Sequence, residues 1–277
     1  TKPRIAVVGL ASVAVGFSIG CRGEFATDTL WHALLGIGAI AAGCSVLNQW
    51  LERETDARMQ RTSRRPLPAG RVTPAEALSF GCGLTCLGAV WLVASVNLLT
   101  AVLALATLLC YVAIYTPLKR VTSLCTAIGA IPGAAPPVLG WTAAGGELDL
   151  SALVIFGILF LWQFPHFLAI AWMYREDYAR AGLKMLPASQ ASGAIGWLAI
   201  GYAIALIPIS LLPRLCGLAG DAYFAAALVL GAGYLFAAVA FAWAQTRLSA
   251  RRLLWTSLIY LPALLAALTI DHWRLLN

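Results

Sequence analysis

The sequence has few charged residues for its length, and this shortage excludes a soluble globular protein. Only 11% of its 277 residues are Asp, Glu, Lys or Arg, whereas 61% are hydrophobic and the mean hydropathy is +0.82. Soluble domains usually carry about 25% charged residues. The chain also lacks a polar linker, a low-complexity tract or a shift in composition, so we expect a single domain over residues 1–277.

Two further absences narrow the class of protein. The alternation of apolar and polar residues that a lipid-exposed barrel needs is missing, so helices must satisfy the backbone in lipid. The seven cysteines form no C-x-x-C pair, which argues against a zinc site and against a disulfide framework. We therefore expect an all-α integral membrane protein, with its helices in one bundle around a central cavity.

Long apolar segments recur along the whole sequence. A bilayer core about 30 Å thick requires roughly 20 apolar residues per spanning helix. The first segment is short, so native residues are expected before Thr1, and because eight more segments follow it we do not expect a cleaved signal peptide. The nine predicted spans are 5–20, 29–50, 76–96, 98–115, 122–142, 151–173, 194–213, 222–244 and 252–270.

The distribution of positive charge predicts the orientation. If the N-terminus and the even-numbered loops share one side, that side holds most of the Lys and Arg residues: Lys2, Arg4, Arg53, Arg58, Arg61, Arg64, Arg65, Arg71, Lys119, Arg120, Arg175, Arg180, Lys184, Arg247, Arg251 and Arg252. The other side holds only Arg22, Arg214 and Arg274. By the positive-inside rule the N-terminal side is cytoplasmic, or the matrix in a mitochondrion. We expect a bacterial inner membrane, with the mitochondrial inner membrane as the alternative.

The densest polar run is "NQWLERETDARMQRTSRRPLP", residues 48–68. Asn48, Glu52 and Asp56 are spaced four residues apart, so on a helix they form one column, with successive residues about 6 Å apart. Glu54 points elsewhere. An amide oxygen and two carboxylates are hard oxygen ligands that suit Mg²⁺, which takes its remaining ligands from water and a phosphorylated substrate.

Arginines follow this column at once, at positions 58, 61, 64 and 65. A cation held by the acids, together with these arginines, would bind a polyanion such as diphosphate. The alternative is a solvated helix end with salt bridges between neighbouring turns.

Two later segments carry comparable chemistry. In "IYTPLKR", Pro117 is expected to end a helix, so Tyr115, Lys119 and Arg120 lie at the membrane boundary and can reach the same anion; the alternative is an aromatic-belt tyrosine beside a topology lysine. In "FPHFLAIAWMYREDYARAGLKMLP", His166 lies at membrane depth. An ionisable residue there is a functional candidate, or a histidine that is hydrogen-bonded to a neighbouring helix.

The motifs resemble the UbiA family of intramembrane prenyltransferases. Asn48, Glu52 and Asp56 match its N-x-x-x-D-x-x-x-D motif, with Glu52 in place of the middle aspartate, and "YTPLK" is similar to its Y-x-x-x-K motif. "RTSRRPLPAGR", "YTPLKRVTSLCTAIGAIPGAAPPVLGW" and the segment around His166 resemble the protoheme IX farnesyltransferase branch, over residues 44–190. The second motif of many relatives, D-x-x-x-D, is incomplete, because Met173 lies four residues before Asp177.

This resemblance implies the substrates and the role of each residue. Farnesyl diphosphate is the expected donor and heme B the expected acceptor, with Mg²⁺ as cofactor and heme A synthase or cytochrome oxidase assembly as candidate partners. The expected metal ligands are Asn48, Glu52, Asp56 and Asp177, and the expected heme ligand is His166. The expected catalytic residues are Asn48, Glu52, Asp56 and Lys119. The expected diphosphate-binding residues are Arg58, Arg61, Arg65, Tyr115, Lys119, Arg120 and Lys184.

Two other functions remain open from the sequence. The first is a UbiA-type prenyltransferase that acts on an aromatic quinone precursor. The second is a membrane transporter of an organic anion, for which the carboxylate column would serve no purpose.

Overall fold

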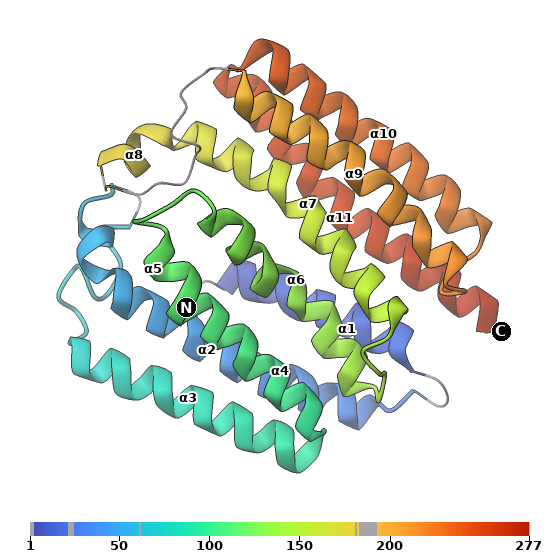
Figure 1. The fold of residues 1–277 in the computed structure, drawn as a ribbon. Coiled ribbons are helices and arrows are strands. Elements are labelled where there is room, and N and C mark those ends of the chain that lie inside the picture. Colours follow the sequence, from blue (N-terminus) through green and yellow to red (C-terminus); the bar gives the residue numbers. More distant parts are fainter. Residues whose placement is uncertain (1–2, 22–24, 61, 181, 183–192, 277) are drawn as a thin grey trace. The chain divides into compact units, whose positions relative to one another are not determined.

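The computed structural model describes residues 3–21, 25–60, 62–180, 182 and 193–276, and the side chains from Ala6 onward. These residues form helices and loops and contain no strand (Figure 1). The long helices are α1 (Pro3–Gly20), α2 (Thr27–Ala57), α3 (Pro74–Ser95), α4 (Leu98–Leu109), α6 (Cys125–Ala143), α7 (Leu150–Met173), α9 (Ala194–Leu215), α10 (Asp221–Ala244) and α11 (Arg247–Leu276). Three short ones are η1 (Cys110–Tyr115), α5 (Thr116–Leu118) and α8 (Arg175–Arg180).

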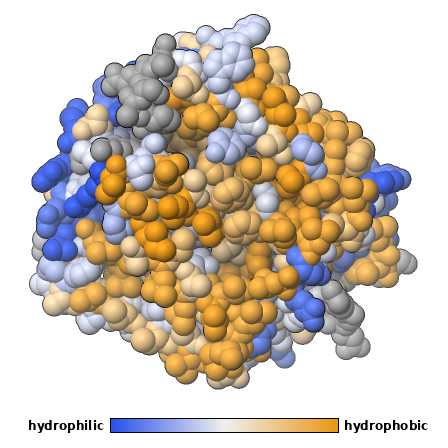
Figure 2. Space-filling view, viewed as in Figure 1, coloured by the Kyte–Doolittle hydropathy of each residue, from blue (hydrophilic) through white to orange (hydrophobic). Residues whose placement is uncertain are grey.

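Each predicted span coincides with helical structure, so the all-α membrane fold is confirmed. Among the described residues, seven helical segments are long and apolar enough to cross a membrane; α1 and α6 fall outside this set. Large apolar side chains such as Val90, Phe236 and Trp243 are exposed, and Figure 2 shows hydrophobic residues over most of the visible surface. A soluble protein rarely exposes so much contiguous apolar surface, whereas lipid tails cover it at no cost.

Short polar sequences start several of the helices. Thr73 and Glu76 form a capping box at the start of α3, where Pro74 occupies the first turn. Asn97 caps α4, and Asp149 caps α7 by accepting a hydrogen bond from the Ala152 N–H. These side chains satisfy N–H groups that would otherwise be unpaired near the edge of the bilayer.

The described residues divide into two compact units. The first unit comprises Thr1–Gly146 and Glu176–Met185, and the second comprises Glu147–Arg175 and Leu186–Asn277. In the first, α2 packs along α3 and α1 packs along α6; in the second, α9 packs between α7 and α10, and α11 contacts both α7 and α10. The single domain expected from composition stays a prediction.

The packing of α1 against α6 depends on two glycines. A Cβ atom added to Gly16 would lie 1.8 Å from the Pro137 carbonyl oxygen, and one added to Gly140 would lie 1.9 Å from the Val13 carbonyl oxygen. Both distances are far shorter than any contact a carbon can make, so only glycine lets the two backbones approach this closely. Small residues have the same role at many contacts between membrane helices.

The predicted span 98–115 contains a π-helical turn. The Thr116 N–H bonds to the carbonyl of Tyr111, five residues earlier, and the Thr116 hydroxyl donates to the same oxygen at 2.8 Å. The expectation that Pro117 ends the helix was wrong, because the helix continues to Leu118. Pro117 lies in the first turn of α5, where its missing N–H leaves no intrahelical bond unmade.

Candidate active site

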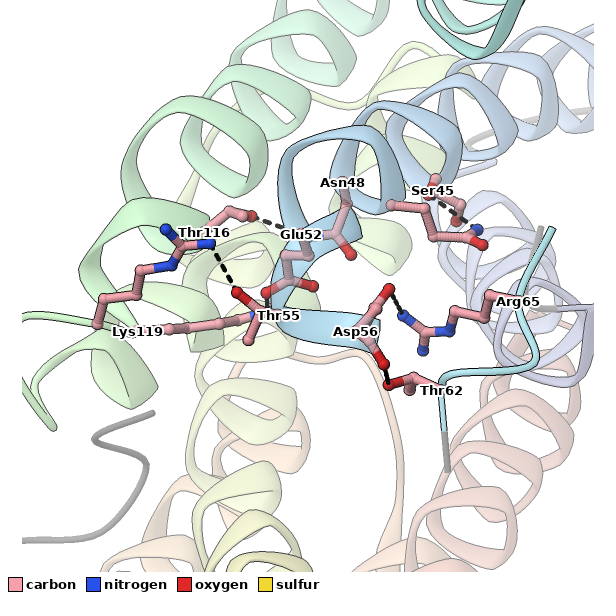
Figure 3. Close-up of polar contacts among 11 residues, drawn as sticks. Ser45, Asn48, Glu52, Thr55, Asp56, Thr62, Arg65, Thr116 and Lys119 are labelled. Atoms are coloured by element: carbon pink, nitrogen blue, oxygen red, sulfur yellow. Dashed lines mark hydrogen bonds and ion pairs between the residues drawn. The ribbon is translucent and has the colours of Figure 1, made fainter. Parts of the chain in front are cut away.

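The carboxylate column lies on the last turns of α2, as its spacing predicts. Asn48, Glu52 and Asp56 project from one side of the helix, and their partners come from α5 and from the loop after α2 (Figure 3). Glu54 is 71% exposed and pairs with Arg53 instead. The three residues of the column therefore lie on the buried face of α2, whereas Glu54 lies on its exposed face.

Asn48 occupies the end of the column nearest the centre of α2. It is fully buried, and its Nδ2 donates to the Thr116 hydroxyl at 3.0 Å. That hydroxyl donates its own hydrogen to Tyr111, so the π-helical turn sets the orientation of the Asn48 amide. The Asn48 Oδ1 atom is buried without a hydrogen-bond partner. Buried acceptors are nearly always paired, so the unpaired Oδ1 of Asn48 is free to bind a ligand such as a cation or a water.

Glu52 forms an ion pair with Lys119, which follows the last residue of the α4–α5 span. The Lys119 Nζ atom lies 2.8 Å from Glu52 Oε1, and the two side chains are only 10% and 13% exposed. Nζ also lies 4.3 Å from the centroid of the Tyr115 ring and 5.9 Å from that of Tyr111. Burial lowers the pKa of Lys119, but the Glu52 carboxylate more than offsets this and holds it above its ordinary value. Lys119 is therefore a buried, charged ammonium held by an acid and two aromatic faces.

Asp56 is paired with an arginine in the same way. Its carboxylate is 1% exposed and accepts a hydrogen bond from Arg65 at 2.6 Å, while the Thr62 hydroxyl donates to the Asp56 backbone oxygen at 2.9 Å. Thr62 thus ties the loop after α2 to the end of that helix. This tie places Arg65 beside the acid although nine residues separate them in sequence.

The other predicted diphosphate ligands have different surroundings. Arg120 donates to the Thr55 hydroxyl at 2.6 Å, and Arg58 is exposed at the end of α2. Arg61 and Lys184 lie outside the described residues. Their binding of an anion stays a prediction.

Asp177 lies in α8, which belongs to the same unit as the column. It is ion-paired with Arg180, one turn further along that short helix. The role of Asp177 as a metal ligand stays a prediction.

The donor atoms in the column fit a partly hydrated hard cation. Within the described part of the chain, no group of three or more His, Cys, Asp or Glu side chains could hold a metal ion. The column offers two carboxylates and the unpaired Asn48 oxygen, so an ion there would need ligands from water or from an anionic substrate. Mg²⁺ commonly binds in this way, through one or two carboxylates and the phosphates of its substrate.

His166 belongs to the other unit. It lies on α7, and its Nδ1 is 2.8 Å from the Ser257 hydroxyl on α11. Its assignment as a heme ligand stays a prediction.

Sequence reasoning missed three residues of the site. Tyr111 lies four residues before Tyr115 and therefore shares its helix face, a signal that could have found it. Thr55 and Thr116 gave no signal, because threonine is common in membrane helices and their partners are more than 60 positions away.

Known proteins share the sequence pattern and the fold of this chain. The model of the UbiA prenyltransferase family matches residues 9–267. A curated relative from Solibacter usitatus, protoheme IX farnesyltransferase, is 46% identical over 282 residues, which cover 98% of this chain and 97% of the relative.

Two solved structures share the fold at low sequence identity. One, described as a digeranylgeranylglyceryl phosphate synthase in membranes, has a TM-score of 0.82 at 17% identity and covers 97% of this chain and 94% of its own. The other, a UbiA homologue from Archaeoglobus fulgidus bound to GPP and Mg²⁺, has a TM-score of 0.67 at 16% identity and covers 96% and 97%. With the family model matched over nearly the whole sequence and the carboxylate column in place on α2, we conclude that the chain belongs to the UbiA prenyltransferase family.

Proposed function

We propose that this chain transfers the farnesyl group of farnesyl diphosphate to a vinyl group of heme B. Water adds in the same reaction, so the products are a hydroxyethylfarnesyl heme, known as heme O, and diphosphate. The observation that carries the proposal is the column on α2, in which two buried carboxylates each hold a cationic side chain beside an unpaired buried amide oxygen. The full-length relative from Solibacter usitatus supports the choice of substrates.

The donor is assigned to the column and its basic neighbours. Asn48, Glu52 and Asp56 would hold Mg²⁺, and a bound ion would supply Lewis-acid stabilisation of the departing diphosphate. Lys119 and Arg65 lie within 3 Å of these acids and would neutralise the remaining phosphate charge. Arg58, Arg61, Arg120 and Lys184 supply further positive charge, and Asp177 a further carboxylate.

The acceptor is assigned to His166. A neutral imidazole is a usual axial ligand of heme iron, and His166 lies on a helix that crosses the membrane. An apolar surrounding dissolves the farnesyl chain and limits quenching of the allylic cation by water before it meets the vinyl carbon.

The chain is an integral membrane protein, and we place it in a bacterial plasma membrane with its basic side in the cytoplasm. The bacterial source of the similar farnesyltransferase and the one-sided distribution of Lys and Arg support this placement. Heme A synthase and the cytochrome oxidase assembly machinery are the candidate partners, because a heme with a farnesyl tail must pass to a protein that shields it from water.

The decisive experiment is a reaction of the purified protein with heme B, farnesyl diphosphate and Mg²⁺, followed by mass spectrometry of the extracted heme. We expect a product heavier by one farnesyl group and one hydroxyl group, formed only when Mg²⁺ is present; the other hydrogen of the water leaves as a proton. Unmodified heme, together with transfer of the farnesyl group to an aromatic quinone precursor supplied in parallel, would contradict the proposal.

A further inference from the structure

The Ser257 hydroxyl on α11 has three polar neighbours: the Leu254 carbonyl, Nδ1 of His166 and the Tyr234 hydroxyl. Its oxygen lies 2.6 Å from the Leu254 carbonyl oxygen and 2.8 Å from Nδ1 of His166. A carbonyl oxygen can only accept, so the single hydroxyl hydrogen is used toward Leu254. With that hydrogen engaged, we assign Nδ1 of His166 as the donor to the Ser257 oxygen. In a neutral imidazole with its proton on Nδ1, the lone pair is on Nε2.

The same serine also orients the ring that stacks on His166. The Trp162 indole lies against the imidazole with ring centroids 5.1 Å apart and 26° between the planes. Its Nε1–H donates to the Ser257 carbonyl at 2.9 Å, and the Tyr234 hydroxyl donates to the Trp162 carbonyl, also at 2.9 Å. Helices α7, α10 and α11 therefore hold the imidazole in one orientation and one tautomer.

Ser257 is completely buried, so water cannot replace its hydroxyl. A histidine kept only for packing would gain nothing from a fixed tautomer, and an apolar side chain would fill its place without the cost of burying a polar ring. Histidines that bind a metal almost always donate their second ring nitrogen to an acceptor, which sets the tautomer and the direction of the ligating nitrogen.

We propose that Ser257 is a positioning residue for the heme substrate: it holds His166 in the tautomer whose Nε2 atom can ligate the heme iron. This inference rests on the proposed function, since heme is the acceptor there. It adds Ser257 to the proposed heme site. Neither the sequence motifs nor their spacing indicated this residue, because it lies 91 positions after His166.

The tautomer can be measured without heme. The chain has only three histidines, so nitrogen NMR of histidine-labelled protein in lipid bilayers resolves each ring, and the His166→Gln variant identifies the signal of residue 166. We expect a protonated Nδ1 and an unprotonated Nε2 at His166, and loss of this single state in Ser257→Ala. A protonated Nε2 in the unaltered protein would overturn the proposal.

Heme titration tests the positioning role. Ser257→Ala should weaken heme binding by about 10- to 100-fold and lower the iron–histidine stretching frequency of ferrous heme, while farnesyl diphosphate binding stays unchanged. Ser257→Thr keeps the hydroxyl and should restore both heme readouts.

The matched control is Ser210→Ala, which removes another fully buried serine hydroxyl, bonded to Tyr260 at 2.7 Å. Ser210→Ala should lower thermal stability without changing the heme spectrum. If Ser257→Ala behaves like this control, Ser257 is structural and the positioning role is overturned while farnesyl transfer to heme stands. If the unaltered protein fails to bind heme although the NMR shows the expected tautomer, the proposed function fails, and the role of Ser257 toward heme fails with it.

Discussion

At the scale of single residues, the site contains two ion pairs. Their acids are the proposed ligands of Mg²⁺, and their cations are the proposed ligands of diphosphate. Glu52 holds Lys119 and Asp56 holds Arg65, so each of these four charges has a partner of opposite sign. A buried charge that loses its partner costs several kcal/mol. We expect the partners to exchange when substrate binds, with the carboxylates turning to the metal ion and the cations to the diphosphate.

Asp56→Asn should lower product formation by about 100-fold or more, because it removes a charge that would bind the metal while keeping the shape of the side chain. The protein should still insert in membranes and elute as a single species. Glu54→Gln is the matched control, since Glu54 is exposed on the same helix, and it should leave the rate unchanged. Mass spectrometry of heme measures both variants, and near-normal conversion by Asp56→Asn would refute the metal assignment.

Lys119→Met should destabilise the chain by about 3 kcal/mol, because it leaves the Glu52 carboxylate buried without its cation. Adding Glu52→Gln to that variant should restore much of the loss, since the double variant buries no unpaired charge. Thermal unfolding in detergent gives the comparison. Additive losses from the two substitutions would show that the pair is not coupled in solution.

Sequence reasoning found the charged residues of the site but not their partners. Asn48, Glu52 and Asp56 were recognisable because a helical repeat places them on one face. The pairing of Asp56 with Arg65, rather than with another of the arginines, depends on the loop held by Thr62, and nothing in the sequence specifies that loop.

At the scale of helices, two local features determine how the helices of the first unit pack. The contact between α1 and α6 brings their backbones together through Gly16 and Gly140. The π-helical turn before Pro117 places Thr116 where it can hold Asn48. π-helical turns often occur at functional sites.

Gly140→Val should destabilise the chain by about 1–3 kcal/mol or more, because the added side chain overlaps the Val13 carbonyl and forces the helices apart. Gly9→Ala is the control on α1, where an added Cβ meets no atom within 4 Å; it should be neutral or stabilise by up to about 1 kcal/mol. Melting temperatures in detergent decide the prediction, and an unchanged value for Gly140→Val would show that this contact does not form.

Thr116→Val should reduce activity about tenfold with little change in stability, because Asn48 loses the hydroxyl that orients its amide. Thr107→Val is the matched control, since Thr107 only donates to a carbonyl of its own helix. The KM for Mg²⁺ is the informative quantity. It should rise in Thr116→Val alone, and equal values in the two variants would contradict a role for the π-helical turn.

The helices themselves were predictable because apolar length is a strong signal in membrane proteins. Their ends were less so. Span 252–270 became Arg247–Leu276, because basic and polar residues at helix ends reach water and let the helix continue beyond the apolar core. The composition of the span did not predict the π-helical turn, because the turn depends on the position of a single residue, Pro117, just after it.

At the scale of the whole molecule, apolar residues are concentrated in the long helices and basic residues in the loops between them. The apolar helices fit a bilayer by length and composition, and the positive-inside rule predicts that the loops rich in Lys and Arg lie on the cytoplasmic side. Because diphosphate is soluble and heavily charged, the proposed binding residues should lie at the membrane edge, where diphosphate can leave into water. The expectation that this side of the protein faces the cytoplasm comes from the distribution of charge alone.

Cysteine labelling measures this orientation. In a variant whose seven native cysteines are replaced, Arg64→Cys should react with a membrane-impermeant maleimide only after the cells are opened. Glu147→Cys, in the short loop before α7, should react in intact spheroplasts, because an odd-numbered loop lies on the other side. The reverse pattern would put the proposed diphosphate-binding residues on the outer side of the membrane and would contradict the orientation on which the proposed function depends.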